Sequence, residues 1–371
     1  MATKERTAGA RLEPTLPARY YCDPAILERE LERIFARSWV CAGRADRIAE
    51  PGDYFTLGIG AEELLITRAA EGRVRAFHNV CRHRGSRLCE AERGHLQGSI
   101  QCPYHAWTYS LDGKLIGTPG MKEGVEICRE EFSLHAAALE TWGGFLFLRV
   151  EPAGPPLSDQ LGDLGERFRR YPLGSLKSAV RLVHEVEANW KILVENYQEC
   201  YHCPGVHPEL CDIVPLYRTG EVDGRGGEIA WFREGASTFT HGGKTRRPFL
   251  TGLNEDEKRR FDGDLVLPNM FLNLFPDYVH TRTLWPLGPG RTRIISEWLF
   301  EPSTMARPDF DPSDAVEFLN LVGWQDWKIC EGVQKGMASR VFKQGVYTPQ
   351  ERYAARIKRW VLEKLGGEPA L

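Results

Sequence analysis

The pattern of apolar positions divides the chain into a helical start, a strand-rich first part and a mixed second part. Asp23 and Pro24 supply an N-cap and a first-turn proline, and apolar residues at helical spacing continue to Phe35, which predicts a helix. From about 39 to 151, short apolar runs such as LLIT and FLFLRV alternate with Gly, Asp and Pro, which predicts a compact antiparallel β unit. The Pro- and Gly-rich segment 151–159 is the expected linker.

The second part of the chain mixes helical and strand patterns. Aromatic and apolar residues at helical spacing predict a helix over 188–203, which Pro204 and a following glycine end. The runs NMFLNLF and RTRIISEWLF predict strands, and two closing helices are expected, one over roughly 312–340 and one opened by a capping box at Thr348. The predicted fold class is α+β, with an antiparallel β domain and a second domain whose antiparallel sheet is packed by helices.

Composition narrows the function classes. A length of 371 residues favours two domains, and 42% hydrophobic with 27% charged residues is ordinary for a globular protein. A net charge of -3 gives no electrostatic footprint for nucleic acid. The start lacks an apolar signal region and no apolar run is long enough to cross a bilayer, so a cytoplasmic protein without a membrane partner is expected. The ten cysteines have no framework spacing and are expected to be reduced thiols plus metal ligands.

Two loops each combine one cysteine with one histidine. The sequence is CRHRG from Cys81 and CPYHAW from Cys102, and eighteen residues separate His83 from Cys102. A [2Fe-2S] cluster in which two histidines replace two cysteines on one iron needs such a pair from each of two loops, and His105 completes the set. Structural zinc is the alternative, but zinc fingers space paired cysteines by about two to four residues and paired histidines by about three to five, and neither spacing fits.

These loops resemble the C-x-H-R-G and C-P-Y-H-x-W motifs of Rieske proteins, although the spacer is slightly longer than usual in that family. Respiratory Rieske proteins carry an additional cysteine in each loop, whereas this sequence has Ser86 and Tyr104 at those places. The resemblance therefore points to Rieske non-heme iron oxygenases, and it covers nearly the whole chain. It implies a Rieske domain at 40–152 and a catalytic domain with a mononuclear iron, made of 1–39 and 153–371.

A second metal site is predicted around the segment NWKILVENYQECYHCPGVHPEL. On a helix, Glu199 and His202 would share one face at i and i+3, and the Pro-Gly break would let His207 fold back toward them. Two imidazoles and one carboxylate on one side of Fe(II) form a facial triad, which leaves open positions for dioxygen and substrate.

The segment resembles the N-W-K...H-x4-H signature of Rieske oxygenases, and that resemblance implies Asp326 as the third ligand. Asp277 and Glu331 are the rival carboxylates. The resemblance also gives Glu199 the role of a bridge that carries electrons between a cluster histidine, His105 by analogy, and an iron ligand. In the family this bridge crosses between subunits of a head-to-tail trimer, so a homotrimer is expected.

The electrons must come from a partner protein. The sequence contains no dinucleotide fingerprint, because GIGAEE lacks the third glycine and GPGRTR follows no strand-turn-helix pattern. The resemblance implies a separate flavin and iron-sulfur reductase, fed by NADH or NADPH and sometimes acting through a ferredoxin.

The substrate class is suggested by the residues around Glu199. A glutamate in an E-C-Y-H-C-P context resembles the branch that oxidises choline, carnitine, glycine betaine and proline betaine, often with N-demethylation. A quaternary ammonium is recognised by aromatic faces, although an aromatic strand is more often core than cage. The candidates for such a cage are Trp231, Phe232, Phe239, Phe271, Phe275, Tyr278 and Trp285. A ring-hydroxylating aromatic oxygenase and a Rieske electron carrier without oxygenase chemistry are the alternatives.

Overall fold

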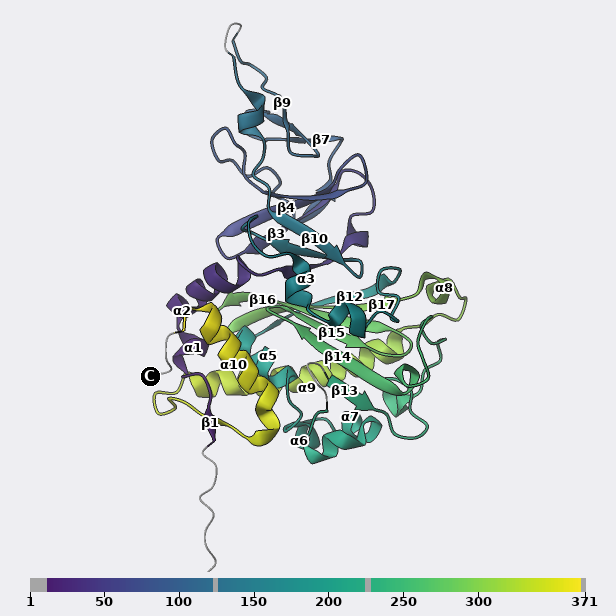
Figure 1. Cartoon of the computed structure of the whole chain (residues 1–371). Coiled ribbons are helices and arrows are strands. Elements are labelled where there is room, and N and C mark those ends of the chain that lie inside the picture. The colour runs from purple at the N-terminus through teal and green to yellow at the C-terminus, as the bar shows by residue number, and fades with distance from the viewer. Residues whose placement is uncertain (1–11, 123–125, 224–227, 368–371) are drawn as a thin grey trace, which may run out of the picture.

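A six-stranded antiparallel sheet forms the centre of the computed structural model, which describes residues 12–122, 126–223 and 228–367 (Figure 1). Its strand order is β12-β17-β16-β15-β14-β13. The strands are β12 (Lys177–Val186), β13 (Glu228–Trp231), β14 (Arg260–Val266), β15 (Met270–Leu274), β16 (Val279–Gly288) and β17 (Arg291–Phe300). The strands predicted from NMFLNLF and RTRIISEWLF are confirmed as β15 and β17.

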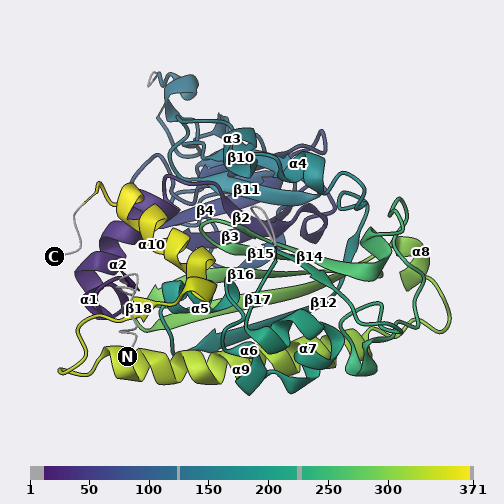
Figure 2. The same cartoon turned by 60° about the horizontal axis from the view of Figure 1, so that its bottom comes forward.

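Both faces of this sheet are covered, which explains why β15 is buried at every position. Leu272 and Leu274 pack with Phe147 of a second sheet on one face. On the other face Phe271 stacks on Tyr197, with ring centroids 3.9 Å apart. Figure 2 shows helices α6 (Cys203–Val206), α7 (Pro208–Ile213) and α9 (Ser313–Met337) together on the side of the sheet opposite that second sheet.

The predicted β unit in the first part of the chain is confirmed as three small antiparallel sheets, ordered β5-β4-β3-β6, β7-β8-β9 and β10-β11-β2. A two-stranded ribbon of β1 and β18 joins the two ends of the chain. The bounds are β1 (Glu13–Pro14), β2 (Val40–Arg44), β3 (Asp53–Ile59), β4 (Glu62–Arg68), β5 (Val74–His78), β6 (Arg93–His95), β7 (Ser99–Gln101), β8 (Thr108–Ser110), β9 (Leu115–Gly117), β10 (Ala138–Trp142), β11 (Phe145–Arg149) and β18 (Val346–Tyr347).

The remaining helices are mostly short. They are α1 (Arg19–Cys22), α2 (Pro24–Glu30), a π-helical turn (Leu31–Phe35), α3 (Leu157–Leu161), α4 (Leu164–Arg167), α5 (Trp190–Tyr197), α8 (Pro302–Met305) and α10 (Arg352–Lys364). Turns of 3-10 helix lie at Ala45–Arg47, Arg129–Phe132, Pro215–Thr219, His241–Gly243, Glu257–Arg259 and Pro349–Glu351. No helix among the described residues combines the length and apolar character that a membrane span needs.

The helix-start predictions are confirmed. The Asp23 carboxylate accepts a hydrogen bond from the Ala25 N–H at 2.9 Å, with Pro24 in the first turn. Thr348 and Glu351 form the predicted capping box ahead of α10.

The helix predicted over 188–203 is wrong in its second half, because α5 ends at Tyr197. The Glu199 carboxylate accepts hydrogen bonds from the backbone N–H groups of Tyr201 and His202. Such side-chain hydrogen bonds compete with those of the helix and favour a turn. The chain therefore folds back just before the histidines.

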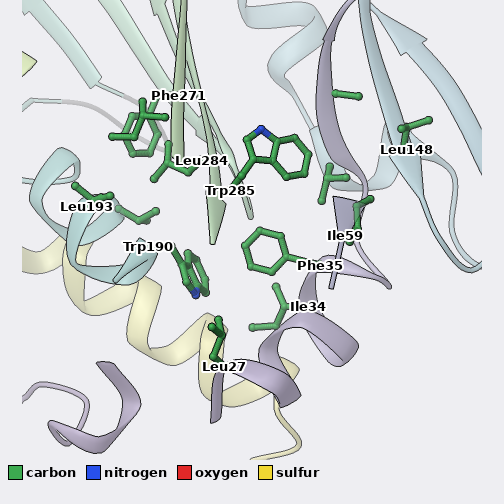
Figure 3. Packing of buried hydrophobic residues seen from close by; sticks show 14 of the residues in the cluster. Leu27, Ile34, Phe35, Ile59, Leu148, Trp190, Leu193, Phe271, Leu284 and Trp285 are labelled. Carbon is green, nitrogen blue, oxygen red and sulfur yellow. The ribbon is translucent and has the colours of Figure 1, made fainter. Parts of the chain in front are cut away.

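The largest hydrophobic cluster crosses the predicted boundary between the two parts of the chain (Figure 3). Phe35 packs edge-on against Trp190, with ring centroids 5.2 Å apart, and Ile59 and Leu148 of the β unit belong to the same cluster. The expected linker is also held in place, because the Arg149 guanidinium donates to the carbonyls of Glu151 and Pro155 at 2.8 and 2.6 Å. The proposed domain limits stay a prediction.

Candidate functional site

The four residues of the predicted cluster site meet at the tips of two matched loops. Cys81 and His83 follow β5, and Cys102 and His105 lie between β7 and β8. Each loop closes in the same way. The Gly85 N–H bonds to the Cys81 carbonyl, and the Ala106 N–H bonds to the Cys102 carbonyl, both at 3.0 Å.

This closure requires a left-handed residue at the same place in each loop. Gly85 has φ of 74° and Ala106 has φ of 55°, and Ala106 is the one non-glycine with positive φ among the described residues. Left-handed backbone costs an alanine more than a glycine, so the turn is held by its surroundings. The consequence is a pair of near-equivalent turns that face each other.

The two turns place sulfur inside and nitrogen outside. Cys81 and Cys102 are buried, whereas His83 is exposed and His105 is partly buried. The two imidazole rings lie 4.7 Å apart between centroids, and Nδ1 of His105 has no hydrogen-bond partner in the described structure. Two thiols on one side and two imidazoles on the other fit a cluster whose two irons have different ligands.

Neighbouring groups favour a thiolate at Cys102, whereas burial raises the pKa of the Cys81 thiol. Burial opposes ionisation of Cys102, but the backbone N–H groups of Tyr104 and His105 outweigh it and lower the pKa of the thiol. The Tyr109 hydroxyl lies 3.3 Å from the sulfur of Cys81. Hydrogen bonds to sulfur tune the potential of such clusters, so Tyr109 is a residue that the sequence analysis missed. Its position two residues after CPYHAW was the available signal.

His202, His207 and Asp326 meet as predicted. One ligand atom from each lies within 4.8 Å of the other two. Nε2 of His207 is 2.9 Å from Oδ1 of Asp326, and Nε2 of His202 is 3.3 Å from the same oxygen. His202 precedes α6, His207 separates α6 from α7, and Asp326 comes from the middle of α9.

Nδ1, the second ring nitrogen of each imidazole, already has a hydrogen-bond partner within the chain. Nδ1 of His202 lies 2.6 Å from Oε1 of Glu199, and Nδ1 of His207 lies 2.7 Å from Oε1 of Gln325. An N–H at Nδ1 that donates to these oxygens leaves the lone pair at Nε2 directed at Asp326. The Nε2 lone pairs of His202 and His207 and the Asp326 carboxylate therefore point at one another. These three electron-rich groups repel unless a cation lies between them, so the residues fit a divalent metal ion.

The pKa values of the metal-free site also indicate that a positive charge is favoured between these side chains. Burial disfavours a charged His202, but its hydrogen bonds to Asp326 and Glu199 outweigh burial and raise its pKa to about 10. Burial likewise opposes ionisation of Asp326, yet the hydrogen bonds from His202 and His207 lower its pKa far below the usual value. A proton takes the place that a metal ion would occupy.

The rival carboxylates lie elsewhere. Asp277 is fully buried and pairs with Arg247 at 3.0 Å, and it also accepts from Thr238 and Thr245. Glu331 accepts from the Glu187 backbone N–H at 3.3 Å. Neither belongs to the group that His202 and His207 form.

Two models of known protein families match the chain, one over each of the two candidate sites. The model of the Rieske [2Fe-2S] domain matches residues 38–141, and the model of the ring hydroxylating alpha subunit (catalytic domain) matches residues 173–367. The chain belongs to the family of Rieske oxygenase alpha subunits. Rieske oxygenases contain a [2Fe-2S] cluster and a mononuclear iron, and they consume dioxygen.

The relatives of this Rieske oxygenase include two named enzymes. A carnitine monooxygenase oxygenase subunit of Acinetobacter baumannii is 38% identical over 345 residues, which cover 91% of this chain and 90% of the relative. A glycine betaine monooxygenase oxygenase subunit of Pseudomonas aeruginosa is 31% identical, covering 90% of this chain and 85% of the relative. The crystal structure of the quaternary ammonium Rieske monooxygenase CntA with L-carnitine is similar at a TM-score of 0.77 and 28% identity, covering 95% of this chain and 96% of that one.

A cavity of about 90 Å³ adjoins the triad of this Rieske oxygenase. About 10–15 Å³ of such space holds one water, so the cavity has room for a small organic molecule. It is lined by triad residues, by Phe239, Phe261 and Phe275, and by the polar residues Glu228, Asn273, His280 and Arg282.

Only part of the predicted aromatic cage lines this cavity. Phe239 and Phe275 do, with ring centroids 4.9 Å apart. The others lie outside the lining for different reasons. Trp285 points to the face of the sheet opposite His280 and Arg282, whereas Phe271 shares their face but is covered by Tyr197. Trp231 is exposed, Phe232 and Tyr278 pack in the neighbouring core, Phe271 stacks on Tyr197, and Trp285 belongs to the cluster of Figure 3.

One cysteine prediction is wrong. Cys200 and Cys203, expected to be ordinary thiols on helix faces other than that of His202, form a disulfide, and their Cα atoms are 4.9 Å apart. The early end of α5 is the reason, since the turn after Tyr197 brings both residues together beside His202. The other eight cysteines are free.

Glu199 holds only one of its two expected partners within the chain. It contacts His202, whereas the cluster loops lie at the opposite end of the molecule from α6 and α7 in Figure 1. Any contact between Glu199 and a cluster histidine therefore needs a second copy of the chain.

Proposed function

We propose that this Rieske oxygenase hydroxylates a carbon next to nitrogen in a quaternary ammonium or N-methylated small molecule, with N-demethylation as one outcome. The observation that carries the proposal is the cavity beside the triad, which combines aromatic walls with the carboxylate of Glu228. A cation without hydrogen-bond donors is bound by aromatic faces and by a carboxylate. The relatives named after carnitine and glycine betaine support the same substrate class.

In this proposal Cys81, His83, Cys102 and His105 ligate the [2Fe-2S] cluster, and His202, His207 and Asp326 ligate the mononuclear iron. When bound, the iron supplies dioxygen activation and the cluster supplies electrons singly. The chain's own part is to hold these groups in place. Glu199 and Gln325 keep the Nδ1 protons of the two histidines, which fixes both rings with Nε2 inward.

The proposed electron route runs through Glu199 to a neighbouring subunit. A closed homotrimer would bring the cluster histidines of one chain, the exposed His83 and the partly buried His105, to Glu199 of the next. The similar structure of CntA was reported with insights into inter-subunit electron transfer, which supports this route. A separate flavin and iron-sulfur reductase, with or without a ferredoxin, would deliver the electrons from NAD(P)H, and a cytoplasmic location stays part of the proposal.

The Glu199→Ala variant tests the route. It is expected to keep the cluster and most of the iron, and to lose nearly all steady-state turnover, because the second electron that each hydroxylation needs can no longer reach the iron from the cluster. Glu234→Ala, which removes an exposed carboxylate away from the cavity and the triad, is the matched control. Normal steady-state turnover in Glu199→Ala would remove this residue from the route.

A reconstituted system tests the substrate class. Purified protein with cluster and iron is combined with a Rieske-oxygenase reductase and NADH, and is offered N-methyl compounds and aromatic acids in parallel. Oxygen uptake coupled to a hydroxylated or demethylated product, identified by mass spectrometry, is expected only with the N-methyl compounds. Coupled product from aromatic acids alone would establish a ring-hydroxylating enzyme instead.

A further inference from the structure

A second cavity lies where the β unit meets the central sheet. Its volume is about 550 Å³, against about 90 Å³ for the cavity beside the triad. About 10–15 Å³ of such space holds one water, so this cavity admits a small organic molecule. One wall is formed by β3, β6 and the 3-10 turn Ala45–Arg47, and the other by β12, β16 and β17. Phe35, Ile59 and Trp285, which also line it, belong to the cluster of Figure 3.

The central sheet separates this cavity from the triad. Arg181 of β12 pairs with Glu297 of β17, and Glu297 pairs with Thr281 of β16. Paired residues of antiparallel strands point to the same face, and adjacent residues of one strand point to opposite faces. Arg181 and His280 therefore lie on opposite faces, and His280 borders the cavity beside the triad. The cavity at Arg181 is a separate site.

Three arginines line this cavity without a carboxylate partner. Arg47 comes from the 3-10 turn, Arg93 from β6 and Arg181 from β12. No described carboxylate forms an ion pair with any of the three. Burial lowers the pKa of Arg47, and the charges of Arg181 and Arg93 lower it further, against Glu297 and Asp46. Both other guanidinium groups therefore lie close enough to repel that of Arg47.

The other charged groups that line the cavity do not cancel these charges. They are the ion pairs Arg87–Glu63 and Arg293–Glu185, and the single carboxylate of Glu92. Glu297 is buried beside the arginines and accepts from the Ser178 hydroxyl at 3.1 Å. Three arginines against two carboxylates leave an excess of positive charge. Guanidinium groups in this state favour a carboxylate or a phosphate, which they can bind in a bidentate manner.

Phe55 places two of the arginines. The Arg47 guanidinium lies over the Phe55 ring, 4.9 Å from its centroid, which is a favourable contact for a cation. Phe55 of β3 also pairs directly with Arg93 of β6. Both arginines are therefore positioned at this ring before any ligand arrives.

An apolar strip continues from the third arginine. Val183 lies two residues after Arg181 in β12, so it shares the face of Arg181 about 7 Å further along the strand. Val183 pairs with Ile295 of β17, and both residues line the cavity. Val183 is 46% exposed, so its apolar surface is open to a ligand. An apolar wall beside a few charged groups is typical of a small-molecule site.

We propose that this cavity binds a small organic anion, whose carboxylate or phosphate is held by Arg47, Arg93 and Arg181 and whose apolar body lies along Val183 and Ile295. The guanidinium groups come from both parts of the chain, so the ligand joins the β unit to the central sheet. A ligand that binds only the folded arrangement raises its stability. The site does not depend on the substrate proposed above, and either proposal can fail without the other.

Calorimetry on the cluster- and iron-loaded protein, without oxygen, tests this site with hexanoate and hexyl phosphate as probes. At least one of these anions is expected to bind at least tenfold more tightly than hexanol, which lacks the charge, and than acetate, which lacks the apolar body. The tighter anion identifies the head group. Arg181→Met should weaken that anion at least tenfold and leave hexanol within twofold. Arg340→Met, at an exposed position outside the cavity, is the matched control.

A second variant and a second measurement guard against misfolding of Arg181→Met. Arg93→Met changes an exposed residue of the β unit and should weaken the same anion at least tenfold, with an unchanged cluster spectrum. The tighter anion should raise the unfolding temperature of the wild-type protein and of Arg340→Met, but not that of Arg181→Met or Arg93→Met.

Three results would overturn the anion site. One is that hexanol binds as tightly as both anions, and another is that both arginine variants keep the affinity of the wild-type protein. The third is that the variants change the oligomer size in sedimentation while anion affinity stays the same. That result would mean that acidic side chains of a second copy, and not a small anion, face these arginines.

Discussion

The two proposed metal sites of this Rieske oxygenase are built in opposite ways. The proposed cluster ligands come from two short turns that are near in sequence, with His83 exposed and His105 partly buried. The proposed triad takes His202 and His207 from one segment and Asp326 from a distant helix, with His207 fully buried. An exposed site suits electron exchange with another protein, whereas a buried site keeps water from the substrate. The exposure of each site therefore matches its proposed role, electron exchange at the cluster and substrate oxidation at the triad.

Breaking the cluster site alone should abolish steady-state turnover. Cys102→Ser removes a buried sulfur ligand, so the visible spectrum of the cluster should disappear, while the triad should still take up iron. Absorption spectroscopy and iron analysis check this. Cys128→Ser, an exposed thiol of the same domain, is the control and should keep the spectrum. A Cys102→Ser protein with an intact Rieske spectrum would contradict the ligand assignment.

Breaking the triad alone should give the complementary result. Asp326→Ala should lower iron affinity by more than the roughly 10–100-fold that loss of an outer hydrogen-bond partner costs, and product formation should fall below detection. The cluster spectrum should be unchanged. Glu331→Ala, on the same helix, should retain the mononuclear iron. Full activity in Asp326→Ala would exclude this residue from the triad.

Removing the hydrogen-bond partner of the His207 imidazole should lower iron affinity less than removing a ligand does. Gln325→Leu removes the acceptor at Nδ1 of His207, so iron affinity should fall by about 10–100-fold, measured by competition with a chelator. Gln325→Glu keeps an acceptor at that place and should restore most of the affinity. Equal loss in both variants would mean that Gln325 acts only through packing.

The smallest expected effect concerns pH. Burial raises the pKa of Glu228 to about 7, against the hydrogen bond from Tyr217. The carboxylate is charged above that pH, so the affinity for a cationic ligand should be full above it and fall by about tenfold per pH unit below it.

Calorimetry from pH 6 to 8 checks this, and Glu228→Gln should flatten that component of the profile. Other charged or titratable groups line the two cavities that Glu228 borders, and the difference from Glu228→Gln separates their contribution. They are Tyr197, Glu199, His202, His207, Tyr217, Asp264, His280, Arg282, Asp326, Tyr353 and Arg356. A pH profile that Glu228→Gln leaves unchanged would assign the dependence to those groups.

The sequence could predict the cluster loops because their chemistry is local. Cys81 and His83 are close along the chain, as are Cys102 and His105, and the turn after each cysteine brings the pair together whatever the rest of the fold does. The antiparallel strands, the Asp23 cap and the Thr348 capping box were predictable for the same reason.

The sequence misplaced features that depend on competition between local and tertiary interactions. The helix end at Tyr197 and the Cys200–Cys203 disulfide follow from the Glu199 side chain bonding to its own turn. Of the aromatic cage, only Phe239 and Phe275 line the cavity, because hydrophobic pattern identifies a strand but not which of two buried faces borders a cavity.

Sequence alone thus determined the family, the residue types of both proposed metal sites and most of the strand and helix patterns, since these depend on neighbours along the chain. Tertiary structure alone decided that Gln325 holds His207, and that Glu228, His280 and Arg282 share one wall of a cavity. Strand register brings these groups together across many residues of sequence, and register is fixed by which faces the whole fold buries.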